Sequence, residues 1–177
     1  MTTPLKKQRP RILIIFNPTA GRRRQKKLYD VVKHIMAAKW DVTLKPTHEV
    51  GDATRLARQA VEDKKYKVIA VAGGDGTINE ALQGLEKAKG YDLPLGIIPL
   101  GTANVLATEL EYPTHSSELA SLFTTGKIQA CYFGQVQTST RTHLFSCMTS
   151  AGFDAQVVAH VSSPFKKMVG KAAYVYT

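Results

Sequence analysis

Two short, uninterrupted apolar runs, Ile12–Phe16 and Val68–Ala72, constrain the fold of this chain more than any other feature. Continuous apolar runs of this length are typical of strands that are buried on both faces of a parallel sheet. Parallel neighbours require long crossover connections, which are usually helices. The two runs therefore predict an α/β architecture.

The segments around these two runs have the patterns of the helices and further strands that such an architecture needs. Apolar residues recur at helical spacing between residues 24 and 39, which predicts a helix whose buried stripe extends to Met36. A second helix is expected after Gly51, with Asp52 as its N-cap. This alternation favours an open, mostly parallel sheet flanked by helices on both faces. The remaining expected elements are strands at 42–44 and 95–98 and helices around 78–85, 103–110 and 119–126.

The pattern changes after Lys127. Segments 128–136 and 143–150 are expected to be strands joined by a polar turn without a helix, which predicts an antiparallel hairpin from a different, β-rich unit. A lone hairpin is only marginally stable. We therefore expect either that the sequence is a fragment of a longer protein or that its C-terminal quarter packs against the first domain. The expected divisions are a basic tail at 1–8, an α/β domain at 9–127 and the incomplete beginning of a β-rich domain at 128–177.

The charge narrows the classes of partner. The chain has 24 Lys and Arg against 14 Asp and Glu, a net charge of +10. A basic surface suits nucleic acid, phosphorylated small molecules or an anionic membrane, although it also serves solubility alone. No zinc-ligand spacing or RNA-recognition aromatic pattern occurs, so we expect no nucleic-acid partner. No apolar run approaches the ~20 residues that span a bilayer, and no secretory signal is recognisable, so we expect a cytoplasmic protein.

Three loops are expected at the carboxyl ends of the strands, where ligands bind in open parallel sheets. They span Asn17–Gly21, Gly73–Thr77 and Pro99–Thr102, and each leads towards a helix N-terminus, which attracts anions. Neither a G-x-x-x-x-G-K-[ST] phosphate loop nor a G-x-G-x-x-G dinucleotide fingerprint is present. The loops together predict an anion-binding edge of another kind.

The middle loop is the most specific signal. Gly73 and Gly74 are expected to allow positive φ and a close approach of the backbone to a ligand. Asp75 beside a phosphate site indicates Mg²⁺ binding or acceptance of a proton from an attacking hydroxyl. The alternative is that Asp75 merely caps the helix that Gly76 and Thr77 begin.

Four stretches of the chain resemble the diacylglycerol kinase catalytic-domain superfamily, which includes bacterial lipid kinases, sphingosine kinases and ceramide kinases. The Gly-Gly-Asp-Gly-Thr sequence alone is shared with NAD kinases and phosphofructokinases, whereas the last stretch makes the resemblance specific. The four stretches are Asn17–Gly21, Thr47–Ala53, Gly73–Glu80 and Pro99–Ala107.

The resemblance implies an NAD kinase- or phosphofructokinase-like nucleotide-binding domain followed by an antiparallel β-sandwich, with ATP and Mg²⁺ as cofactors. It implies transfer of the γ-phosphoryl group to a hydroxyl of diacylglycerol or a related lipid, at the inner face of a membrane. By motif position, Asp75 is the catalytic residue and lies close to the metal. The residues expected to bind ATP are Asn17, Thr47, Gly73, Gly74, Asp75, Gly76, Thr77, Ile78, Asn79, Gly101, Thr102 and Asn104.

Two departures from the family pattern affect the expected activity. Val105 stands where many members have Asp, and the later sandwich strands and a downstream catalytic Glu have no counterpart. We therefore expect this chain to bind nucleotide but to be weakly active or inactive as an isolated kinase. The alternatives are a soluble-substrate kinase of the NAD kinase type and a non-catalytic nucleotide-binding or basic membrane-surface module. The oligomeric state is left open.

Overall fold

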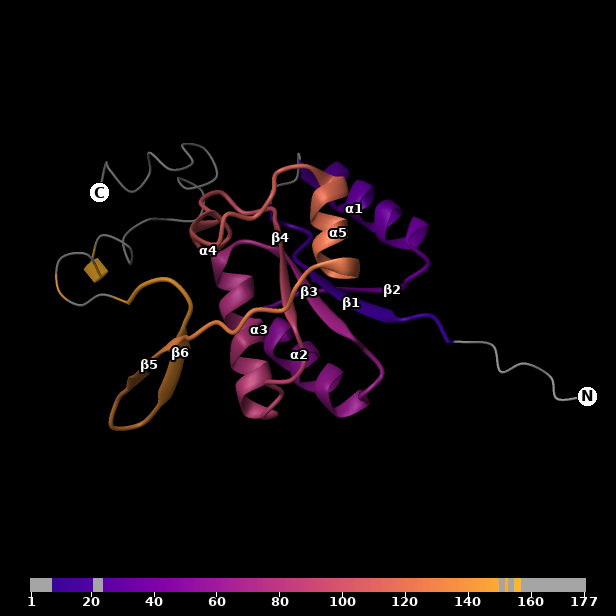
Figure 1. Ribbon diagram of the computed structural model, residues 1–177. Helices are drawn as coiled ribbons and strands as arrows, with labels where there is room; N and C mark the ends of the chain where they lie inside the picture. The colour runs from indigo at the N-terminus through magenta and orange to yellow at the C-terminus, as the bar shows by residue number, and fades with distance from the viewer. Residues whose placement is uncertain (1–7, 21–23, 150–151, 153–154, 157–177) are drawn as a thin grey trace, which may run out of the picture.

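The computed structural model describes residues 8–20, 24–149, 152 and 155–156, and its centre is a four-stranded sheet (Figure 1). All neighbouring strands are parallel, and their order is β2-β1-β3-β4. The predicted open parallel sheet is thus confirmed. The strands are β1 (Arg11–Phe16), β2 (Asp41–Pro46), β3 (Val68–Gly73) and β4 (Leu95–Pro99).

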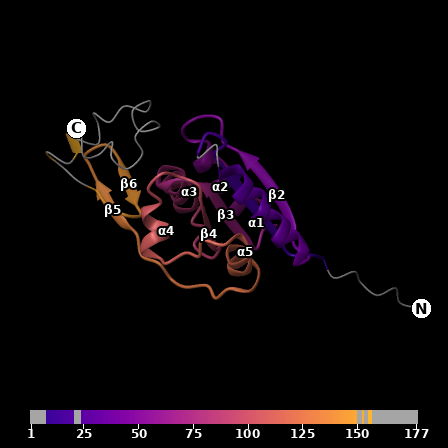
Figure 2. The same cartoon turned by 90° about the horizontal axis from the view of Figure 1, so that it is seen from above.

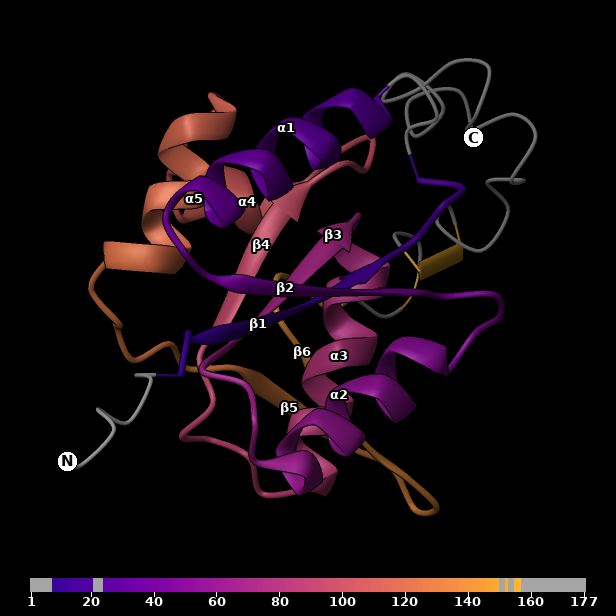
Figure 3. The ribbon, with the colours of Figure 1, turned by 90° about the vertical axis from the view of Figure 1, so that its right-hand side faces the viewer.

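Helices cover both faces of this sheet, as predicted. Figure 3 shows α1 and α5 on one side of the strands and α2 and α3 on the other. The short helix α4 follows the end of β4. The helices are α1 (Gln25–Ala37), α2 (Asp52–Asp63), α3 (Asp75–Lys87), α4 (Val105–Glu109) and α5 (Ser116–Thr125).

The apolar run in β1 has the expected physical cause. Ile12 and Ile14 are buried in the cluster beneath α1 and α5, whereas Leu13 and Ile15 belong to the cluster beneath α2 and α3. Successive side chains of a strand point to opposite faces, so a strand with a core on each side has to be apolar throughout. Burial of each such side chain contributes about 1.5–3 kcal/mol.

Two details of the predicted helices are wrong. Met36 is 58% exposed, because α1 packs mainly against α5 and the sheet and leaves this side of its last turn to solvent. Asp52 is the first residue of α2 rather than its N-cap. Gly51 holds the N-cap position with φ of 93°, in the left-handed region that glycine adopts without a steric penalty.

The predicted hairpin is present but shorter than expected. Its strands are β5 (Gly134–Gln137) and β6 (Thr142–Phe145), which pair antiparallel. Residues 128–133 were expected in the first strand but pair with no strand in the described part of the chain. Seen from above, the hairpin lies beside α3 and far from α1 and β2 (Figure 2). Within the described ranges, no helix is long and apolar enough to cross a membrane.

Candidate functional site

Loops from all four strands meet at one edge of the sheet, because the strands are parallel and their carboxyl ends therefore coincide. Asn17 follows β1, Thr47 follows β2, Gly73 ends β3, and residues 100–104 connect β4 to α4. The loop that contains Thr47 joins the three that the strand pattern predicts. The predicted residues in the first turns of α3 are Asp75, Gly76, Thr77, Ile78 and Asn79, and those before α4 are Gly101, Thr102 and Asn104.

The loops after β3 and β4 are locked together through their backbones. The carbonyl oxygen of Gly73 accepts hydrogen bonds from the amides of Leu100 and Gly101, at 3.0 and 3.1 Å. A Cβ atom on Gly101 would lie 2.5 Å from the Cα atom of Gly74, closer than any real contact of this kind. Position 101 therefore requires glycine for close approach, whereas a Cβ atom on Gly74 would lie 3.3 Å from the Cα atom of Gly101, a tight contact but not a clash.

The predicted positive φ at the glycine pair is wrong. Neither Gly73 nor Gly74 has a positive φ, and Gly74 is extended, with φ of −98° and ψ of −179°. The reason for glycine at position 73 is again space, since a Cβ atom there would lie 2.8 Å from the hydroxyl oxygen of Thr77. The loop is compact because of contacts between neighbours rather than because of unusual dihedral angles.

Asp75 does not cap its own helix, whose N-cap is Gly74 without a side-chain hydrogen bond, and its carboxylate instead contacts α4. It is the first residue of α3, and its Oδ1 accepts a hydrogen bond of 3.2 Å from the amide of Leu106 in the first turn of α4. Its other oxygen, Oδ2, accepts no hydrogen bond from the described residues and can face a cation or an acceptor hydroxyl. Val105, the departure from the family pattern, precedes Leu106 directly.

Two amide oxygens at this edge are buried without a partner among the described residues, Asn79 Oδ1 and Asn104 Oδ1. The Nδ2 of Asn104 donates to the carbonyl of Gly101 at 2.9 Å, which fixes the orientation of that side chain. A buried acceptor without a donor costs about 1–3 kcal/mol. Such a cost is relieved when a bound ligand or its ordered water supplies the donor.

This donor set suits a magnesium ion shared with phosphate groups. The described part of the chain holds no group of three or more His, Cys, Asp or Glu residues that could bind a metal by themselves. Mg²⁺ typically takes one or two carboxylates and completes its shell with substrate phosphates and water. Asp75 offers one carboxylate, so the residues present fit that mode of binding.

Ile78 contributes to the core rather than to the rim of the site. Its side chain is fully buried in the core beneath α2 and α3, and its amide donates to the carbonyl of Gly74, so neither is directed to a ligand. Thr102, in contrast, is exposed on the loop before α4.

The first loop is shaped by its own asparagine. The Oδ1 of Asn17 accepts from the amide and the hydroxyl of Thr19, at 2.9 and 2.8 Å. The guanidinium of Arg24, the N-cap residue of α1, donates to the carbonyl oxygen of Gly101, which ties the start of α1 to the loop after β4. The neighbouring arginines 22 and 23 lie outside the described residues.

The loop around Thr47 depends on two carboxylates whose hydrogen bonds to this loop the sequence did not predict. Asp52 accepts from the amides of His48 and Glu49, and Glu80 accepts from the amide of Gly51. The hydrogen bond from the His48 amide, together with the Arg55 side chain, lowers the pKa of Asp52 from 3.8 to about 2. In the sequence, the position of Asp52 directly after a glycine at the expected start of a helix is the signal that could have indicated this role.

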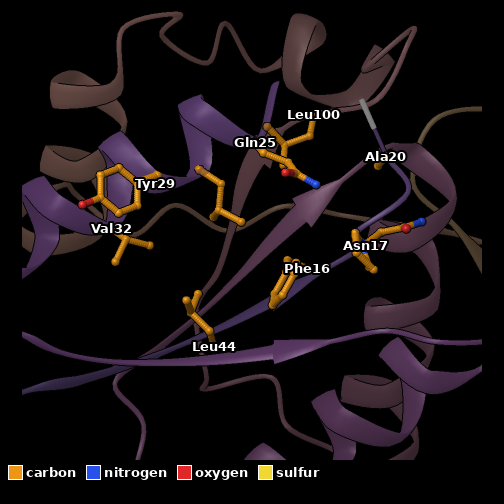
Figure 4. Close-up of a pocket in the computed structure, with 10 residues that line it drawn as sticks. Phe16, Asn17, Ala20, Gln25, Tyr29, Val32, Leu44 and Leu100 are labelled. Carbon is orange, nitrogen blue, oxygen red and sulfur yellow. The ribbon is translucent and has the colours of Figure 1, made fainter. Parts of the chain in front are cut away.

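An apolar pocket of about 380 Å³ opens beside this edge, on the α1 side of the sheet (Figure 4). Asn17 is the one predicted site residue that lines it. Helix α1 and the edge strand β2 form its walls, and Tyr29 and Leu44 remain partly exposed there. The apolar lining suits an aliphatic or aromatic group and not a phosphate.

Comparison with known proteins finds the same family as the sequence motifs. The family model of the diacylglycerol kinase catalytic domain matches residues 11–136. A protein from Alcanivorax borkumensis named "Probable lipid kinase YegS-like" is 36% identical over 137 residues, 77% of this chain and 44% of its own. A "Diacylglycerol kinase" from Staphylococcus saprophyticus is 34% identical over 167 residues, 94% of this chain and 53% of its own.

A solved structure shows the same fold. The crystal structure of a diacylglycerol kinase from Bacillus anthracis superposes with a TM-score of 0.58 at 34% identity, and the match covers 69% of this chain and 42% of that one. This chain therefore spans about half the length of the proteins that it matches.

Proposed function

This chain belongs to the diacylglycerol kinase catalytic-domain family, and from that premise we propose that it is the nucleotide-binding part of an ATP- and Mg²⁺-dependent lipid kinase. The reaction moves the γ-phosphoryl group of ATP to a hydroxyl of diacylglycerol or a related lipid. Lipid transfer is proposed for the protein as a whole, because the chain spans about half of its relatives.

The observation that carries this proposal is that hydrogen bonds and close backbone contacts join neighbouring loops at one edge of the sheet. Phosphoryl transfer depends on positioning and charge neutralisation more than on covalent chemistry. The amides, hydroxyls and small residues of these loops suit a polyphosphate, since helix N-termini bind anions. Asn17, Thr47, Gly74, Thr77 and Thr102 are proposed to surround ATP, with the other predicted positions supporting them.

Asp75 is proposed as the catalytic residue and as the protein's ligand for Mg²⁺. When bound, the ion would neutralise negative charge on the phosphates. The hydrogen bond from Leu106 to Oδ1 holds the carboxylate so that Oδ2 is available at the site. In this proposal the carboxylate of Asp75 takes the proton from the acceptor hydroxyl as it attacks.

The acceptor side is proposed to lie towards the β-rich segment. Residues 9–127 form the nucleotide-binding domain in this proposal, and residues 128–177 begin the domain that completes the lipid site. Membrane association is proposed to be peripheral, at a cytoplasmic face, where the positive charge of the chain favours anionic lipids.

A radiolabel transfer assay tests this function. The native-length protein, of which this chain is proposed to be the nucleotide-binding part, is incubated with γ-labelled ATP, Mg²⁺ and vesicles that contain diacylglycerol, with an Asp75→Asn variant in parallel. Asparagine keeps an oxygen that can accept from Leu106, so the loop is preserved while the charge is removed. We expect label in the organic phase that is lost with Asp75→Asn.

Two results would contradict the proposal in different ways. Label confined to water-soluble products, with NAD as acceptor, would indicate a soluble-substrate kinase. Absence of nucleotide binding, together with affinity for anionic vesicles that Asp75→Asn does not change, would indicate a basic membrane-surface module.

A further inference from the structure

In the loop that connects β2 to α2, residues 47–51, most of the backbone amides donate hydrogen bonds to neighbouring groups. The amide of Thr47 donates to the carbonyl of Phe16 at 2.9 Å. The amides of His48 and Glu49 donate to the carboxylate of Asp52, at 2.8 and 3.3 Å. The first bond joins the loop to the end of β1, next to Asn17, and the other two come from the loop's own helix, so none of the three reaches α3.

Glu80 provides the connection across the site. Its Oε2 accepts a hydrogen bond of 2.9 Å from the amide of Gly51, 29 residues earlier in the chain. Gly51 is the residue with φ of 93° that ends the loop and caps α2. An acceptor at this point therefore fixes the loop at its left-handed residue, where α2 begins.

Helix packing holds Glu80 rigidly in place. The hydroxyl of Thr54 in α2 donates to the backbone carbonyl of Glu80 at 2.8 Å. One turn further along α3, a Cβ atom on Gly84 would lie 2.3 Å from the carbonyl oxygen of Thr54, so the two helix backbones are in direct contact. The carboxylate of Glu80 thus extends from a fixed point to the loop.

We propose that Glu80 is a positioning residue for the nucleotide site, which holds the Thr47 loop against the helix that carries Asp75 and Thr77. Glu80 touches no substrate in this role and acts through the Gly51 amide. The inference rests on the proposed function, because it assigns a use to the Thr47 loop in binding ATP. The hydroxyl of Thr47 makes no hydrogen bond with the described residues, so the loop's position decides where that hydroxyl lies.

The test measures nucleotide affinity in the full 177-residue chain and needs no phosphoryl transfer. Isothermal titration calorimetry with AMP-PNP and Mg²⁺ compares the wild type with Glu80→Gln and Glu80→Met. Glutamine retains an oxygen acceptor for the Gly51 amide, whereas methionine keeps the length of the side chain and removes the acceptor. Glu86→Met, on the same helix with Tyr91 as its exposed partner, is the matched control.

We expect Glu80→Gln and Glu86→Met to bind within about twofold of the wild type. Glu80→Met is expected to weaken binding about tenfold, the effect of losing one hydrogen bond to a charged acceptor. Its thermal unfolding midpoint should stay near that of Glu86→Met. Because the effect passes through the loop, combining Glu80→Met with Thr47→Val should weaken binding no further than the stronger single change.

The outcomes separate this inference from the proposed function. If the wild type binds AMP-PNP and Glu80→Met binds equally well, or if Glu80→Gln is as weak as Glu80→Met, the inference is overturned and the proposed function stands. If the wild type does not bind AMP-PNP, the proposed function fails and the inference with it. Should Glu80→Met unfold, Glu80→Ala replaces it under the same expectations.

Discussion

Gln83 of α3 forms two hydrogen bonds with the backbone of Leu144 in β6. Its Nε2 donates to the carbonyl of Leu144 at 2.8 Å, and its Oε1 accepts from the amide of the same residue at 3.3 Å. The side-chain amide thus copies the donor and acceptor pair that a neighbouring strand would present. The helix that begins with Asp75 thereby also holds the hairpin.

Replacing Gln83 with Met is expected to loosen the hairpin without disturbing the nucleotide edge. The change leaves the donor and acceptor of Leu144 without their partner, at a cost of about 1–2 kcal/mol. Amide exchange at Leu144 should accelerate about tenfold, while exchange in β1 and β3 stays the same. Hydrogen exchange followed by mass spectrometry measures both.

Gln59→Met provides the matched control, because Gln59 is exposed on α2. Equal exchange rates at Leu144 in both variants would show that Gln83 does not hold the hairpin.

The sheet and its helices follow from the sequence because they depend on local periodicity. The run Ile12–Phe16 is apolar throughout because it is buried on both faces, and this cause is visible in the sequence itself. The links between loops are not, because they join residues that are distant in the chain. Glu80 and Gly51 are 29 positions apart, and Asp75 and Leu106 are 31 apart.

The glycines illustrate the same limit. Gly51 has the positive φ that was expected at the glycine pair. At Gly73 and Gly74 the missing side chain instead leaves space for a neighbour, Thr77 and Gly101 respectively. Sequence shows that a position is glycine but not whether the requirement is a dihedral angle or space. That distinction needs the neighbouring loop, which only the folded chain brings near.

Asp52 gives the protein a specific sensitivity to acid. Its pKa is lowered from 3.8 to about 2 by the hydrogen bond from His48, the Arg55 side chain and the Glu49 amide. A lowered pKa in the folded state stabilises the fold above the unfolded value. This contribution is complete above about pH 5, declines as the pH falls and is lost near pH 2.

Urea unfolding of the wild type and of Asp52→Asn between pH 2 and pH 6 tests this sensitivity. We expect the variant to be less stable at pH 6 and the gap between the two proteins to narrow as the pH falls towards 2. Asp92→Asn, at an exposed position, should show no such convergence. A gap that stays constant across this range would contradict the assigned role of Asp52.

Gly101→Ala is expected to damage the site through its backbone. The new Cβ atom would lie 2.5 Å from the Cα atom of Gly74 and 2.8 Å from Asn104 Oδ1, so the two loops must move apart. Overpacking of this kind costs about 1–3 kcal/mol. The separation would also weaken the hydrogen bond from Gly101 to Gly73, and with it the affinity for AMP-PNP.

Gly76→Ala supplies the contrast for stability. Nothing lies within 4 Å of a Cβ atom at position 76, which is in the first turn of α3. Alanine there is expected to stabilise the fold by about 0.5 kcal/mol, because it restricts the unfolded chain more than glycine does. Thermal unfolding should therefore shift in opposite directions for the two variants. A Gly101→Ala protein as stable as the wild type would mean that the loops after β3 and β4 are not in close contact. The nucleotide site could then not depend on that contact to hold the two loops in place.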